Sequence, residues 1–271
     1  MTLKNVFLIL FLSLATCPLA SISTYSQTTD DGSVQNNASS GIPSTGLVTT
    51  DQLLDQVCTH LKEQKAFELQ MDITYENVLD SGKKVQFSAY QNVMVQKPNL
   101  LRANYVGDND SQNFYFNGQT FTIESPLEAV YATKDAAVKT IDEVVDLIDE
   151  RFGIRIPLSN LYVNDPCTAI SANIQDSVFL GYNMVNREPA YHLLFIGEER
   201  DFQLWVKDGD IPLPLKVVIT YKNLPQAPQY TAVLSNWNFS PEFSPNTFSF
   251  QPSEDAFGIK VLPPLSNSES K

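Results

Sequence analysis

Apolar and polar residues alternate along most of the chain after residue 66, with the two-residue period of half-buried β-strands. The segment 67–75 shows this most clearly, because every second residue is Phe, Leu, Met, Ile or Tyr. Asn117-Gly118 is typical of a tight hairpin turn between two strands. The pattern predicts strands over 67–75, 85–89, 93–96, 101–106, 113–116, 120–125, 177–182, 190–196, 202–207, 214–221, 230–239 and 247–250.

Two segments have the 3.6-residue period of amphipathic helices instead. The first is capped by Thr50 or Asp51 and ends near Lys65, and the second covers 136–152 with Gly153 as its C-cap. A large antiparallel sheet curls and needs cover on its concave side, so we expect both helices there. The predicted fold is mainly β with α: a half-open, strongly curled antiparallel β-barrel of roughly ten or eleven strands closed by helices.

The amino-terminal residues have the pattern of an export signal. Lys4 precedes an apolar run over 6–15, which is shorter than the roughly 20 residues that cross a bilayer. We therefore predict that residues 1–23 are a signal peptide and that the protein is periplasmic or lies in the cell envelope. The residues up to Cys17 approximate a bacterial lipobox, which would make Cys17 a lipid anchor. Ordinary cleavage nearby is the alternative, because Thr16 departs from the lipobox pattern.

Composition divides the remainder of the chain. Residues 24–50 are rich in Ser, Thr, Asn and Gly, and we predict a flexible tether there. Residues 51–262 contain no further linker and are predicted to be a single domain. A Pro- and Ser-rich tail at 263–271 is expected to be disordered.

Charge and residue counts narrow the classes of function. The chain has 31 acidic and 18 basic residues, a net charge of −13, which disfavours nucleic acid and anionic membrane as partners. With no long apolar run beyond the signal, we do not expect an integral membrane protein. His60 and His192 lie outside any nucleophile motif, so we expect no enzyme and no cofactor. We predict no metal site, because 108–119 lacks the glycine and the final acidic residue of a calcium loop.

Two cysteines, Cys58 and Cys167, remain if Cys17 is modified or removed. In an oxidising compartment they could form a disulfide across a long loop. The sequence gives no distance between them, so the bonded and the free forms both stay open.

Four short motifs follow one another along the strand-forming part of the chain. They are VQKPNLLR at 95–102, FYFNGQTF at 114–121, SP at 125–126 and FSFQP at 248–252. Together they resemble the bacterial lipoprotein-carrier (LolA/LolB-like) superfamily. Three further stretches, at 79–87, 148–154 and 211–214, are similar to an uncharacterised group of predicted periplasmic proteins within that superfamily, over roughly 55–262.

The resemblance implies an apolar cavity for acyl chains between the curled sheet and the helices. In the carriers a basic residue just before a proline helps to latch the helical lid, and Lys97 occupies this position without the forked donors of arginine. No apolar loop tip occurs near 80–82, so a membrane-inserting role like that of the receptor is not expected. The candidates for lining the cavity are Phe87, Phe116, Trp205 and Trp237, and packing in the core is the alternative for such residues.

We therefore expect an exported, non-enzymatic protein that binds a lipid, a lipoprotein acyl chain or another hydrophobic ligand. The alternative is a periplasmic sensor or scaffold that binds a partner protein of the envelope. The acidic face of 142–150 offers a surface for such a partner, although an acidic face is also the usual solvent side of a helix.

Overall fold

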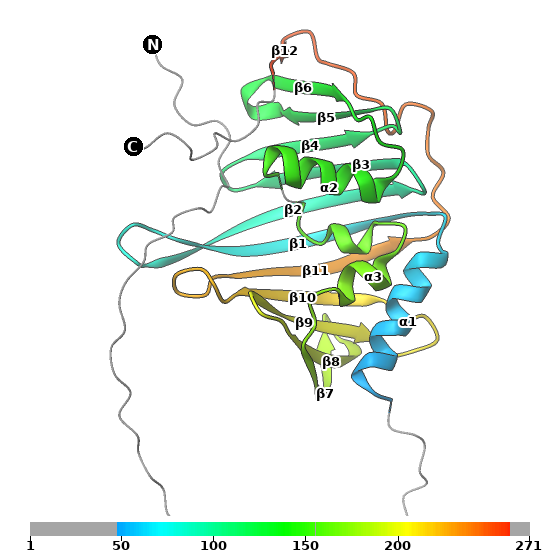
Figure 1. Cartoon of the computed structure of the whole chain (residues 1–271), viewed down its shortest axis with the longest axis vertical. Helices are drawn as coiled ribbons and strands as arrows, with labels where there is room; N and C mark the ends of the chain where they lie inside the picture. Colours follow the sequence, from blue (N-terminus) through cyan, green and yellow to red (C-terminus); the bar gives the residue numbers. More distant parts are fainter. Residues whose placement is uncertain (1–47, 155, 261–271) are drawn as a thin grey trace, which may run out of the picture. The chain divides into compact units, whose positions relative to one another are not determined.

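The computed structural model describes residues 48–154 and 156–260. The predicted signal peptide 1–23, Cys17, nearly all of the tether 24–50 and the tail 263–271 lie outside the described residues. Between Val48 and Lys260 the described chain forms one twelve-stranded sheet, and three α-helices lie against one side of it (Figure 1). We call this the helix-facing side of the sheet and the other the outer side.

The strands follow one another as a meander interrupted once by the helices. The helices are α1 (Thr50–Glu63), α2 (Ile141–Phe152) and α3 (Pro166–Ser171), with 3-10 turns η1 (Pro126–Glu128) and η2 (Ser159–Leu161). The strands are β1 (Ala66–Val78), β2 (Lys84–Gln96), β3 (Leu100–Gly107), β4 (Ser111–Phe116), β5 (Thr120–Ser125), β6 (Val130–Asp135), β7 (Asp176–Val185), β8 (Glu188–Ile196), β9 (Arg200–Lys207), β10 (Pro214–Tyr221), β11 (Gln229–Asn238) and β12 (Phe257–Gly258).

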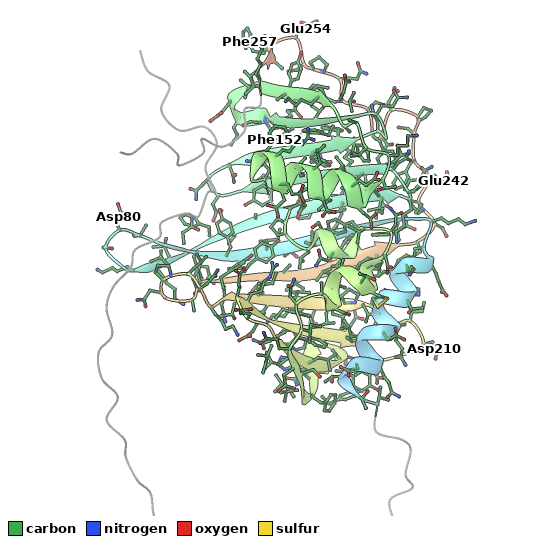
Figure 2. All side chains as sticks on the ribbon, in the orientation of Figure 1. Asp80, Phe152, Asp210, Glu242, Glu254 and Phe257 are labelled. Atoms are coloured by element: carbon green, nitrogen blue, oxygen red, sulfur yellow. A yellow bond between two sulfur atoms is a disulfide. The ribbon has the colours of Figure 1, made fainter. Side chains whose placement is uncertain are left out.

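The sheet stays open, with the order β12-β6-β5-β4-β3-β2-β1-β11-β10-β9-β8-β7. All neighbours are antiparallel except the short pair β12 and β6. Strands β1 and β2 are the longest, at 13 residues each, and Figure 2 places Asp80 at the tip of their hairpin. The mainly β, half-open antiparallel fold predicted from the sequence is therefore confirmed.

The helices begin and end where local side chains satisfy their free backbone groups. Thr49 caps α1 and Thr140 caps α2, each in a capping box with the Gln or Glu three residues later. Gly153 ends α2 with a φ of 64°, a conformation that favours glycine. Both helices bury an apolar stripe against the sheet. Those stripes are Leu53, Leu54, Val57, Leu61, Ile141, Val144, Ile148 and Phe152.

Three details of the predicted elements are wrong. The cap of α1 is Thr49 rather than Thr50 or Asp51, and the second helix begins at Ile141 because residues 130–135 form β6 against β5. The predicted strand 247–250 does not pair; Phe248 is buried and Phe250 packs against the rings of Tyr115 and Tyr131. Fusion of 85–96 into β2 and the addition of β6 and β12 give twelve strands instead of ten or eleven.

Within the described ranges, none of the helices combines the length and the apolar character needed to cross a membrane.

Candidate functional site

The helix-facing side of the sheet carries one large apolar cluster. Alternate residues of β1 to β5 and of β8 to β11 contribute to it, and the apolar stripes of α1 and α2 complete it. Phe67, Leu69, Met71 and Ile73 show the pattern on β1, where each is at most 3% exposed. Side chains therefore fill the space between the sheet and the helices.

Lys97 connects the sheet to the end of α1. It lies between β2 and β3, and its Nζ donates a hydrogen bond of 2.8 Å to the carbonyl oxygen of Leu61. That carbonyl belongs to the last turn of the helix, where carbonyls lack partners within the helix and attract positive charge. Burial lowers the pKa of Lys97 to about 8, although the nearby carboxylates of Asp142 and Asp165 act in the opposite direction.

The residue after Lys97 connects the other two helices to the same turn. The Pro98 carbonyl accepts hydrogen bonds from the backbone N–H of Ile141 at 2.9 Å and from the side-chain amide of Asn164 at 3.2 Å. The Asp142 carboxylate accepts from the backbone N–H of Asn164 at 2.9 Å and from that of Asp165 at 3.4 Å. The start of α2 and the start of α3 are thus both fixed beside the predicted latch.

A disulfide between Cys58 and Cys167 joins α1 to α3. The sulfur atoms are 2.11 Å apart and the Cα atoms 4.9 Å apart. Asp55 lies next to both sulfurs, but bonded sulfurs are not thiolates and do not hold a metal ion. The pair therefore acts as a covalent link within the helix layer.

A row of large side chains crosses the helix-facing side from β8 to β2. The strand registers place one residue of each strand directly opposite the next, so the six side chains share one face. The row is Phe195, Phe202, Ile219, Tyr230, Tyr75 and Phe87, on β8, β9, β10, β11, β1 and β2. We call these six residues the aromatic row.

Two neighbouring pairs of rings in the aromatic row stack on one another. Phe195 and Phe202 have centroids 4.7 Å apart, and Tyr75 and Phe87 have centroids 5.7 Å apart. At the usual spacing of strands, the six positions span about 24 Å. Tyr75, Phe87 and Phe202 are only partly buried, so the row is accessible at several points along its length.

Two tyrosine hydroxyls lie in this apolar interior. Tyr230 is 8% exposed, and its hydroxyl is buried with no hydrogen-bond partner among the described residues. Tyr162 follows η2 in the helix layer, is fully buried, and its hydroxyl lies 3.7 Å from the sulfur of Met71. Burial raises the pKa of both phenols well above the usual value, so both remain neutral donors.

The four predicted cavity residues lie in different places. Phe87 belongs to the aromatic row, whereas Phe116 is a fully buried core residue on β4. Trp237 is half-buried beside Phe239 at the end of β11, with ring centroids 5.6 Å apart. The sequence reasoning missed the other row residues, because each is an ordinary alternating residue until the strand registers are known.

Trp205 lies on the outer side of the sheet. Its neighbours Leu204 and Val206 face the helices, so alternation turns the indole away from them. There the ring stacks on His192 at 3.9 Å and carries the Lys216 ammonium 4.7 Å from its centroid. The prediction that Trp205 lines a cavity beneath the helices therefore does not hold.

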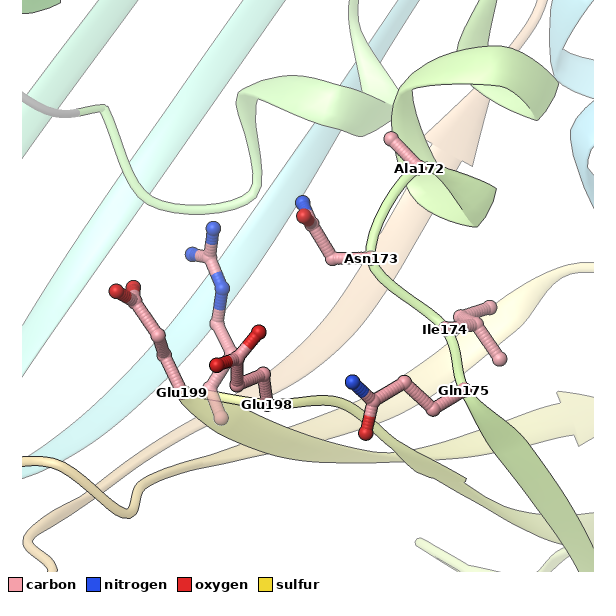
Figure 3. Close-up of a pocket in the computed structure, with 7 residues that line it drawn as sticks. Ala172, Asn173, Ile174, Gln175, Glu198 and Glu199 are labelled. Carbon is pink, nitrogen blue, oxygen red and sulfur yellow. The ribbon is translucent and has the colours of Figure 1, made fainter.

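Two surface pockets lie at the margins of the helix layer. The first has a volume of about 500 Å³, and Figure 3 shows Asn173 and Gln175 across from Glu198 and Glu199. The second, of about 440 Å³, lies between α1 and the β9–β10 loop, where Figure 2 labels Asp210. Both are lined mainly by polar and charged side chains, which does not suit an apolar ligand.

Comparison with solved structures gives distant likenesses. An uncharacterized conserved protein of Thermus thermophilus has 8% identity and a TM-score of 0.46, covering 77% of this chain and 97% of that one. LprF of Mycobacterium bovis has 15% identity and a TM-score of 0.43, and the match covers 73% of this chain and 97% of LprF. A LolA superfamily protein of Nitrosomonas europaea has 11% identity and a TM-score of 0.37, covering 75% and 99%. Likenesses with such scores carry no argument about function.

Comparison of the sequence itself is more informative about the family. No curated protein matches the sequence. The model of one family does match, over residues 50–262, which is most of the chain, and its description is "Predicted periplasmic protein (DUF2092)". This match agrees with the resemblance seen in the short motifs of the sequence. The chain belongs to this family of predicted periplasmic proteins.

Proposed function

We propose that this protein binds the acyl chain of a lipid or lipoprotein along the aromatic row, beneath the helix layer, without catalysing a reaction. The observation that carries the proposal is the row itself. It is continuous over six strands, apolar, and partly accessible at Tyr75, Phe87 and Phe202. A continuous, mostly apolar track of this kind suits an extended hydrocarbon chain better than a compact ligand.

The energetics favour such a ligand. Burial of each methylene group contributes about 0.8 kcal/mol, so a long acyl chain offsets the entropy lost on association. Side chains already fill the interior, so the helix layer must shift for the chain to enter. The disulfide fixes α1 to α3, so we expect the movement in the parts of the helix layer that no covalent bond holds.

A binding titration tests the proposal. The exported protein is titrated with a fluorescent palmitate analogue, alongside the variants Phe87→Asp and Val106→Asp. Phe87→Asp puts a charge into the row and should weaken binding by about tenfold or more. Val106 is 58% exposed and outside the row, so Val106→Asp should bind like the wild type. Absence of binding by the wild type, or equal binding by Phe87→Asp, contradicts the proposal.

A second candidate function is binding of a partner protein, and strand β7 favours it. β7 is an edge of the sheet, and no described strand pairs with its outer side. Five of its apolar side chains are 40–60% exposed: Val178, Phe179, Leu180, Tyr182 and Met184. Such an edge is able to accept an extended segment of another protein. Two copies of this chain, each with a net charge of −13, repel one another, which favours a different partner.

Hydrogen exchange tests this second function. A partner purified from the envelope should slow amide exchange in β7 and should lose affinity for the variant Met184→Lys. Val106→Lys, at a similarly exposed site, should retain it. If a bound partner leaves β7 exchange unchanged, it does not use this edge.

A further inference from the structure

The Tyr230 hydroxyl is an unexplained polar group in the core. It lies in the middle of the aromatic row, on the residue opposite Tyr75 and Ile219. No described residue forms a hydrogen bond with it. Burial of an unpaired hydroxyl costs free energy, so the Tyr230 hydroxyl requires an explanation.

A second hydroxyl approaches the same place from the helix layer. Tyr162 donates to the Met71 sulfur at 3.7 Å, and a thioether is a weak acceptor. Tyr162 and Tyr230 belong to the same buried apolar cluster, and the Tyr162 phenol adds to the effect of burial in raising the pKa of Tyr230. One donor from the sheet and one from the helix layer are therefore present in the same apolar region.

The chemistry of these donors selects the acceptor. The titratable side chains that interact with Tyr230 are the phenols of Tyr105, Tyr162 and Tyr221, and none of them supplies positive charge. An ionised carboxylate would lose its hydration there without a cation to replace it. A neutral carbonyl oxygen accepts hydrogen bonds from phenols at a much smaller desolvation cost.

We propose that the hydroxyls of Tyr230 and Tyr162 hold the carbonyl oxygen of an ester- or amide-linked acyl chain whose hydrocarbon lies along the aromatic row. This inference rests on the proposed acyl-binding function and adds a specificity to it. The protein then prefers esterified or amide-linked acyl chains to free ionised fatty acids. The hydrocarbon supplies most of the affinity, and the two hydroxyls fix the position of the chain along the row.

Three pyrene-labelled probes with the same chain length test the anchor: a fatty-acid methyl ester, the free acid and the alkane. At neutral pH the wild type should bind the ester more tightly than the acid. Tyr230→Phe should weaken binding of the ester by about fivefold, the effect of one neutral hydrogen bond, and leave binding of the alkane unchanged. Tyr162→Phe should have the same selective effect. Tyr90→Phe is a matched change at a side chain that is 39% exposed, and it should alter binding of neither the ester nor the alkane.

The possible failures are distinguishable. If the wild type binds both ester and alkane but Tyr230→Phe binds the ester equally well, the anchor is wrong and acyl binding stands. A loss of ester and alkane binding to the same extent points to damaged packing and also overturns the anchor. If the wild type binds none of the probes, the acyl-binding function and the anchor both fall. Thermal unfolding of Tyr230→Phe checks that the variant folds, and we expect no loss of stability, because only an unpaired hydroxyl is removed.

Discussion

The disulfide in the helix layer should make a large, measurable contribution to stability. Cys58 and Cys167 are separated by 109 residues, so their bond closes a long loop in the unfolded chain. Loop-closure entropy for this separation corresponds to about 4–5 kcal/mol. Because domains are commonly stable by about 5–15 kcal/mol, the double variant Cys58→Ala/Cys167→Ala should lose a large part of its free energy of unfolding.

Urea unfolding followed by circular dichroism measures this loss. The oxidised wild type is compared with the double variant and with the wild type kept in reductant, and the last two should unfold at similar urea concentrations. Hydrogen exchange should accelerate first in α1 and α3, the two elements that the bond joins. A loss of less than about 1 kcal/mol, with unchanged exchange in both helices, would refute the reasoning about loop closure.

Three further predictions concern the turn at Lys97 and the two ends of α2. The pKa of Lys97 is about 8 in the folded chain and 10.5 in a free side chain, so stability should rise as pH increases from about 8 to 10.5, where the unfolded chain binds the extra proton. After allowance for partial exposure of Lys97, the expected gain in the free energy of unfolding is about 1 kcal/mol. Urea unfolding of Lys97→Met should show no such rise with pH, and an equal rise in this variant would contradict the prediction. Asp142→Ala should cost about 1–3 kcal/mol in the same assay, because it leaves the backbone N–H groups of Asn164 and Asp165 without their acceptor, whereas Asp80→Ala at the exposed hairpin tip should cost little. Gly153→Ala should cost about 1 kcal/mol through its φ of 64°, and an unchanged unfolding midpoint would contradict that assignment.

The strand pattern of the sheet was predictable because alternation is a local property. Strands β1 and β2 show it most clearly in their own sequences. β6 was not recognised, because the apolar residues Ala136 and Val138 just after it extend the period of α2 backwards, and only pairing with β5 makes 130–135 a strand. Residues 247–250 alternate in the same way but do not pair, since Phe250 packs on the rings of Tyr115 and Tyr131.

The candidate site was less predictable, because it depends on strand register. Tyr75 and Tyr230 lie opposite one another although they are far apart in the sequence, and nothing local indicates this. Trp205 illustrates the same limit, because a shift of one residue decides whether a side chain faces the helices or the outer side. Lys97 was identifiable from its family motif, whereas its acceptor, the Leu61 carbonyl, depends on how α1 packs.

The most direct test of acyl binding is the identification of lipid that the protein carries when it is purified from the cells that produce it. The full-length protein is purified without detergent that strips lipid, and bound material is extracted and analysed by mass spectrometry. We predict ester- or amide-linked acyl species in near-stoichiometric amount, reduced in the Phe87→Asp variant. Protein that carries no lipid, and that takes up no fluorescent acyl probe when it is offered one, would contradict the account.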